Sequence, residues 1–196
     1  MKRSLHTLLR EIRGCTICEP ELPLGARPVV QCDPAARILI VGQAPGRRVH
    51  ESGIPFDDPS GDRLREWLGV DRERFYDPKS FAIVPMGFCF PGMGSGGDLP
   101  PRPECAPQWR ERLLAELPHV ETTIVLGRYA MDYHLPQKTK SVTAAVSTWK
   151  ELWPRIVPIA HPSPRNQRWF RRNAWFLDEL IPKLQRRVKR LLPKAE

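Results

Sequence analysis

Four of the five cysteines in this 196-residue sequence have spacings that suit metal binding. Cys15 and Cys18 form a Cys-x-x-Cys pair, and Cys89 and Cys105 bound a stretch that is rich in glycine and proline. Four thiolates can hold a [4Fe–4S] cluster or a tetrahedral zinc ion. The fifth cysteine, Cys32, precedes an Asp-Pro turn, and we expect it to be structural. The cysteines therefore predict one metal site, of either kind.

A second candidate is the turn GQAPG at residues 42–46, which follows an apolar run. Two glycines and a proline make a tight turn whose backbone N–H groups can face a ligand. Phe56 follows ten residues later, directly after Pro55, and its ring is a possible stacking platform for a nucleic-acid base. Taken singly, the turn also suits an ordinary strand-to-loop connection, and Phe56 also suits a core position.

The third candidate is the run HPSPRN at residues 161–166. Two prolines stiffen the loop that carries His161, so that little conformational entropy is lost when a ligand binds. Ser163, Arg165 and Asn166 follow His161 and add polar groups beside it. A histidine taken alone is more often structural, so this segment indicates a functional site only in combination with the other two candidates.

The elements that must position these residues follow an alternating pattern. Short apolar runs rich in β-branched residues predict strands at residues 37–41, 81–84, 122–126 and 156–160. Helical patterns lie at residues 62–68, 107–117, 127–135 and 173–192, and Pro182 is expected to kink or restart the last of them. The alternation predicts an α/β fold, a three-layer αβα sandwich around a mostly parallel four-stranded sheet. The Gly- and Pro-rich stretch between residues 88 and 107 is expected to form neither helix nor strand.

This topology predicts where the two turns lie. Ligand sites in parallel α/β sheets lie at the carboxyl ends of the strands. The strand at residues 37–41 leads directly into the GQAPG turn, and the strand at residues 156–160 leads directly into His161. Both turns are therefore expected at one edge of the sheet. Because no linker or repeat divides the sequence, we expect one domain over residues 1–196.

Charge and hydropathy narrow the class of protein. The net charge is +9, and residues 161–196 hold ten lysines and arginines against three acidic residues. Such a basic segment attracts a polyanion such as DNA, although a solvated basic helix has the same composition. No apolar run approaches the roughly 20 residues that a bilayer crossing needs. We expect a soluble cytoplasmic protein, associated with the nucleoid through DNA; nothing in the sequence indicates a membrane or protein partner, and a monomer is assumed.

Taken together, these motifs resemble the uracil-DNA glycosylase superfamily, most closely its iron–sulfur (family 4) branch. The resemblance rests on the order and spacing of the Cys-x-x-Cys pair, the GQAPG turn, the GIPF run at residues 53–56, two later cysteines with fifteen residues between them, and the histidine-proline turn. It implies a DNA glycosylase that flips a damaged base, uracil in the first place, out of DNA and hydrolyses its N-glycosidic bond, starting base excision repair. A second hypothesis is an iron–sulfur DNA-binding protein of the same fold that is non-catalytic or has a different specificity.

The resemblance also implies roles for individual residues. The backbone around Gln43 and Ala44 would bind the flipped base, and Phe56 would stack on it. His161 would donate a hydrogen bond to the base and stabilise the anion that forms as the bond breaks. The segment after His161 would press into the duplex and hold phosphate through Ser163, Arg165, Asn166 and Arg168. A structural [4Fe–4S] cluster, with zinc as the alternative, would be held by Cys15, Cys18, Cys89 and Cys105.

Two features depart from the pattern of the relatives. Pro85 stands where relatives place the Asn that reads the pyrimidine edge, four residues before the third cysteine of the set. Gln43 and Ala44 stand where relatives keep acids, and a glutamine can position water but is not a base. A water-activating carboxylate, if the reaction needs one, is therefore expected elsewhere. Asp57 is the preferred candidate among three nearby acids, Glu51, Asp57 and Asp58.

Overall fold

The structure is a computed structural model that describes residues 4–192. A four-stranded sheet lies at its centre, made of β1 (Ile38–Val41), β2 (Phe81–Ile83), β5 (Thr122–Leu126) and β6 (Ile156–Ile159). The strand order is β2-β1-β5-β6, and every neighbouring pair is parallel. All residues of β1 and β2 are buried, as expected for strands that are covered on both faces. The predicted α/β fold is confirmed, with a sheet that is entirely parallel.

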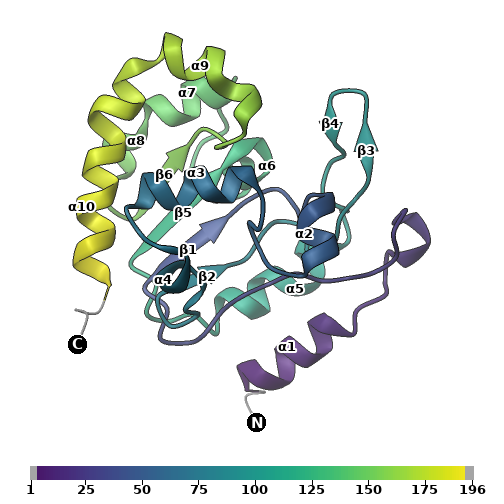
Figure 1. The fold of residues 1–196 in the computed structure, drawn as a ribbon. Coiled ribbons are helices and arrows are strands. Elements are labelled where there is room, and N and C mark those ends of the chain that lie inside the picture. Colours follow the sequence, from purple (N-terminus) through teal and green to yellow (C-terminus); the bar gives the residue numbers. More distant parts are fainter. Residues whose placement is uncertain (1–3, 193–196) are drawn as a thin grey trace.

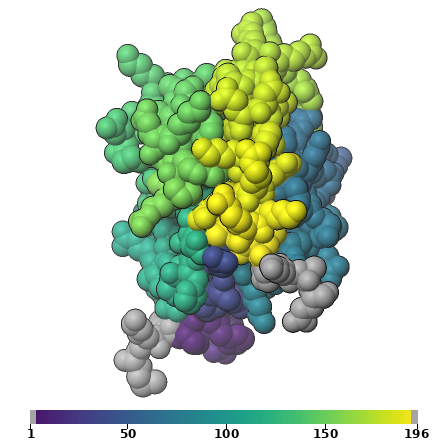
Figure 2. Space-filling model, turned by 90° about the vertical axis from the view of Figure 1, so that its left-hand side faces the viewer, coloured from purple at the N-terminus to yellow at the C-terminus, as the bar shows by residue number. Residues whose placement is uncertain are grey.

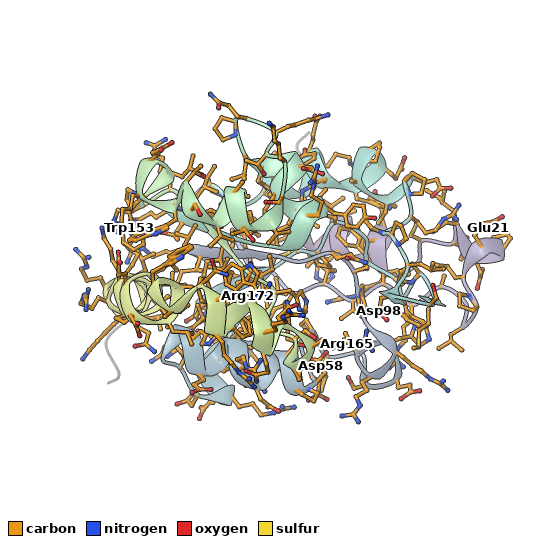
Figure 3. The ribbon with its side chains drawn as sticks, turned by 90° about the horizontal axis from the view of Figure 1, so that it is seen from above. Glu21, Asp58, Asp98, Trp153, Arg165 and Arg172 are labelled. Carbon is orange, nitrogen blue, oxygen red and sulfur yellow. The ribbon has the colours of Figure 1, made fainter. Side chains whose placement is uncertain are left out.

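Helices cover both faces of this sheet (Figure 1). Seen from above, α3 (Pro59–Leu68) and α10 (Ile181–Leu191) lie on one face, and α5 (Cys105–Leu114) and α6 (Gly127–His134) lie on the other (Figure 3). Figure 2 shows α10, in yellow, running between the blue segment that includes α3 and the green segments that follow α6. The Gln185 side chain joins α10 to α3, because its Nε2 donates to the carbonyl of Glu66 at 3.0 Å.

Shorter helices fill the connections. α1 (Leu5–Arg13) packs against α5, and α2 (Arg47–Ser52) follows the turn after β1. α4 (Arg72–Tyr76) precedes β2, while α7 (Val142–Ser147) and α8 (Trp149–Leu152) lead into β6. Within residues 4–192, no helix combines the length and the hydropathy that a bilayer crossing requires.

The last helical region divides where Pro182 predicts a break. A π-helical segment, η3 (Phe176–Leu180), precedes α10, whose first turn contains Pro182. Before it, η2 (Pro164–Asn166) and α9 (Gln167–Arg172) follow the turn after β6. The Trp67 ring of α3 lies 5.3 Å from the ring of Phe170 and 5.0 Å from that of Phe176, so aromatic packing anchors this region on the core.

The prediction that residues 88–107 form neither helix nor strand is wrong. β3 (Met93–Gly94) and β4 (Gly97–Asp98) pair in an antiparallel hairpin that projects from the molecule near α2 (Figure 1), and α5 already begins at Cys105. Gly92 and Gly97 have φ values of 104° and 133°, which L side chains rarely adopt. The glycines that argued against regular structure thus permit the hairpin.

Candidate active site

The carboxyl ends of β1 and β6 open onto a cavity of about 240 Å³. The sequence predicted that the turns after these two strands meet at one edge of the sheet, and they do. Pro85, which follows β2, is buried and contributes to the wall. The cavity gathers six of the predicted site residues: Gln43, Ala44, Phe56, His161, Ser163 and Arg165.

The turn at residues 42–46 is fixed by the segment that follows β2. The carbonyls of Gly42 and Gln43 accept hydrogen bonds from the N–H groups of Met86 and Gly87, both at 2.9 Å. The side chain of Gln43 is engaged as well, because its Nε2 donates to the carbonyl of Leu99 at 2.7 Å and, more weakly, to that of Asp98 at 3.4 Å. Gln43 therefore holds the β3–β4 hairpin against the turn.

Phe56 occupies the wall of the cavity in a strained conformation. Its φ of 55° lies in the left-handed region, which costs a bulky residue on the order of 1–3 kcal/mol. Gly61 permits this conformation, because a Cβ there would lie 1.7 Å from the Phe56 carbonyl oxygen. The ring stands edge-on to Phe75 at 6.3 Å, and its tip lies 3.5 Å from where a Gly42 Cβ would be. These contacts fix the aromatic ring beside the first turn.

His161 is held in one tautomer. The N–H of Ser163 donates to its Nδ1 at 3.2 Å, so the ring proton of a neutral imidazole must be on Nε2. Burial lowers the pKa of His161 below its usual 6.5, which favours that neutral form. The loop is anchored twice: Asn166 Nδ2 donates to the His161 carbonyl at 2.8 Å, and Arg63 donates to the carbonyls of Pro162 and Ser163.

The acids near the first turn differ in their surroundings. Asp57 is not among the residues that line the cavity, and its Oδ1 accepts a hydrogen bond from Arg72 Nη2 at 2.8 Å, which lowers the pKa of its carboxyl. Glu51 pairs with Arg47 at 3.0 Å and also lies outside the lining. Asp58 does line the cavity, but its Oδ1 caps α3 by accepting the N–H of Gly61 at 2.8 Å.

Sequence reasoning missed a further carboxylate, that of Asp98 at the end of β4. Asp98 lines the cavity, and an added Cβ on Gly46 would lie 3.3 Å from its Oδ2. Burial raises the pKa of its carboxyl; the nearby charge of Arg165 opposes this and that of Asp58 adds to it. Figure 3 shows Asp58, Asp98 and Arg165 close together, although they come from three different segments. Nothing in the sequence near Asp98 indicates this placement.

The predicted DNA-binding residues fall into two groups. Ser163 and Arg165 line the cavity, and Arg165 Nη1 lies 3.0 Å from where a Gly97 Cβ would be, beside the hairpin. Asn166 uses its amide on the His161 carbonyl, and Arg168 is exposed on α9 outside the lining. Helix α10 lies on the opposite side of the molecule from the β3–β4 hairpin (Figure 1). Up to residue 192, the basic C-terminal segment therefore does not form one continuous surface around the cavity.

All four cysteines of the predicted metal site line a second cavity. An ion pair between Arg112 and Glu11 (2.6 Å) holds α1 against α5, which brings the Cys15–Cys18 segment near Cys105. Phe88 N–H donates to Cys105 Sγ at 3.4 Å. Burial raises the pKa of Cys89 to about 11 and that of Cys105 to about 12. Within residues 4–192, no three His, Cys, Asp or Glu side chains converge on a single point where one metal ion could sit.

A buried arginine connects the two cavities. Arg110 of α5 is 1% exposed, and its Nη1 donates to the carbonyls of Val84 (3.3 Å) and Pro85 (3.0 Å), while its Nη2 meets His134 Nε2 at 2.6 Å. Because α5 begins at Cys105 and Pro85 lines the first cavity, Arg110 links the cysteine segment to the wall of the candidate active site.

The sequence model of the Uracil DNA glycosylase superfamily matches residues 29–185 of this chain. This match spans most of the 196 residues and includes the whole lining of the first cavity. It also includes Cys89 and Cys105 but begins after Cys15 and Cys18. The resemblance to the superfamily is thereby confirmed, while the iron–sulfur branch stays a prediction.

Proposed function

This chain belongs to the uracil DNA glycosylase superfamily, and on that premise we propose that it releases a damaged base from DNA by hydrolysing the N-glycosidic bond. The observation that carries the proposal is the pairing of Phe56 with a neutral His161 in one cavity at the sheet edge. An aromatic face offers stacking for an extruded base. A neutral imidazole with its proton on Nε2 offers a hydrogen bond to a base oxygen.

The chemistry follows from where charge develops. As the bond between C1′ and the base nitrogen breaks, its electron pair moves onto the base and the sugar becomes cationic. The hydrogen bond from a fixed N–H donor to a base oxygen is stronger in this transition state than in the ground state, and it therefore lowers the barrier. His161 is suited to this task because Ser163 and Asn166 fix the orientation of its ring and its loop.

Uracil is our first candidate base. The position at which relatives carry a pyrimidine-reading Asn is Pro85, whose ring offers neither donor nor acceptor to the cavity that it lines. Base selection would therefore rest on the backbone of the first turn and on the shape of the cavity. The oligonucleotides used to test base release must therefore include hypoxanthine as well as uracil.

We further propose that the cysteine cavity holds a structural [4Fe–4S] cluster. Four half-buried thiols and an N–H···S hydrogen bond suit a cluster, whose irons would supply the positive charge that partly desolvated thiolates need. A single zinc ion is the poorer fit, because it requires the sulfur atoms to converge on one point and a cubane gives each thiolate its own iron. The role of the cluster would be to hold α1 and α5 together, at a distance from the reaction.

The test is base release under single-turnover conditions, from single- and double-stranded oligonucleotides that contain uracil or hypoxanthine. We expect release of at least one base, and a loss of about 10²- to 10³-fold in rate for His161→Ala. His119→Ala, an exposed histidine outside the cavity, is the matched control and keeps the wild-type rate. Tight DNA binding without any release would favour the other function of the same fold, a non-catalytic DNA-binding protein.

A further inference from the structure

Hydrolysis of the N-glycosidic bond is faster when a group accepts a proton from the attacking water, and the first turn contains no acid for this task. Gln43 and Ala44 carry no acid, and the Gln43 amide is already bonded to the hairpin. Three acids, Asp57, Asp58 and Asp98, remain as candidates around the cavity. They differ in the structural contacts that their carboxylates already make. This difference selects one of them.

Asp57 and Asp58 both have structural partners. Asp57 is bound to Arg72 and does not line the cavity. Asp58 lines it but caps α3, so one of its two carboxylate oxygens already accepts a hydrogen bond from the Gly61 N–H. The hydrogen bond from Arg72 makes Asp57 a weaker proton acceptor, because it stabilises the charged form of that carboxyl.

Asp98 differs from both. Among residues 4–192, no group forms a direct hydrogen bond or ion pair with its carboxylate. Asp98 nevertheless lines the cavity, and its carboxylate lies against Gly46 of the first turn. The charged groups that act on it are Arg165 and Asp58, and His161 lines the same cavity. Asp98 as a whole residue is exposed, but partial desolvation raises the pKa of its carboxyl, which makes it a better proton acceptor.

The position of Asp98 is fixed by Gln43, which stands where relatives carry an acid. Gln43 Nε2 donates to the backbone carbonyls of two consecutive residues, Asp98 at 3.4 Å and Leu99 at 2.7 Å. The hairpin is tied at its other strand as well, because Leu99 N–H donates to Gly92 O at 2.9 Å. The first turn thus anchors, through an amide, the segment that carries a carboxylate.

We propose that Asp98 is the catalytic carboxylate of this site and that Gln43 is its positioning residue. The inference rests on the proposed glycosylase function. The Asp98 carboxylate accepts a proton from water as the water oxygen forms a bond to C1′ of the deoxyribose. The C1′–N bond breaks, its electron pair leaves with the base, and His161 donates a hydrogen bond to the resulting anion. The negative charge of Asp98 also stabilises the cationic sugar.

The test compares three substitutions in single-turnover release of uracil and hypoxanthine from oligonucleotides. Asp98→Asn keeps the size of the side chain but removes the base, and we expect the rate to fall about 10²-fold or more. Asp98→Glu keeps a carboxylate and should retain more of the rate than Asp98→Asn. Asp178→Asn, an exposed acid on η3, is the matched control and leaves the rate unchanged.

Two further readouts separate catalysis from a structural role. DNA affinity should stay within about threefold for Asp98→Asn or tighten, because a negative charge leaves the DNA-facing surface. The wild-type rate should fall at acid pH as a carboxyl group becomes protonated, and this limb should be absent in Asp98→Asn. An unchanged rate for Asp98→Asn, or a rate loss that follows Asp57→Asn instead, overturns the inference while the glycosylase function stands. If the wild type releases no base, the proposed function fails and the inference falls with it.

Discussion

Replacing Gln43 by glutamate restores the kind of residue that relatives carry in the first turn, yet we expect it to harm this protein. In the structure the Gln43 Nε2 donates to two carbonyl oxygens, those of Leu99 and Asp98. In Gln43→Glu, a carboxylate oxygen would face the same two acceptors and would lie near the Asp98 carboxylate. The attraction that holds the hairpin would become a repulsion.

The magnitude follows from these contacts. Loss of the short bond to Leu99 and the long bond to Asp98 removes about 1–2 kcal/mol, and the repulsion brings the total to roughly 2 kcal/mol or more. Opening of the hairpin should therefore become about 30-fold more favourable. Gln43→Met removes the donor without adding charge, so that only the loss of about 1–2 kcal/mol applies; this corresponds to about 5- to 30-fold and to less than Gln43→Glu produces.

Hydrogen exchange of the Leu99 amide measures this opening directly, because that N–H is bonded across the hairpin to Gly92. We expect faster exchange in the order wild type, Gln43→Met, Gln43→Glu, with the amides of β1 unchanged as an internal reference. Base release should fall in the same order. Unchanged exchange at Leu99 in Gln43→Glu would refute the anchoring role, and faster base release would show that an acid at position 43 acts directly.

Three other predictions address the histidine, the backbone and the cysteines. Burial lowers the pKa of His161 below 6.5, so the neutral donor persists below that pH; the single-turnover rate measured between about pH 5 and pH 8 should show no inflection near 6.5, and one that His161→Asn removed would contradict the lowered pKa. Gly61→Ala places a Cβ 1.7 Å from the Phe56 carbonyl and should cost about 3 kcal/mol, seen as a drop in Tm of roughly 10 °C, whereas Gly96→Ala, with nothing within 4 Å of the added Cβ, is the control; equal Tm values would show that Phe56 is not held there. Cys89→Ser should lose iron and brown colour in protein purified without oxygen, and Cys32→Ser should keep both; colourless, iron-free wild type would rule out the cluster.

Most of the fold could be predicted from the sequence because each central strand is a short run rich in β-branched residues that is buried on both faces. Such strands are recognisable from the composition and spacing of their apolar residues. The sequence also predicted that His161 and the first turn meet, because a parallel sheet places the ends of such strands at one edge. The hairpin could not be predicted, since the glycines of residues 92–97 read as irregular until their positive φ values are known. Asp98 was missed for the same reason. Asp57 is one of three acids near the first turn in sequence, but its contact with Arg72 depends on tertiary packing, which the sequence does not record.

The central claim is that the cavity between Phe56 and His161 receives a base from DNA. The most direct test is a crystal structure of the wild-type protein with an oligonucleotide whose target deoxyuridine carries a 2′-fluorine, which slows cleavage. We predict an extruded base that stacks on Phe56 and accepts a hydrogen bond from His161 Nε2 at about 2.7–3.2 Å, with Asp98 on the sugar side. A base that remains stacked in the DNA, or DNA that lies along α10 away from the cavity, would contradict the account.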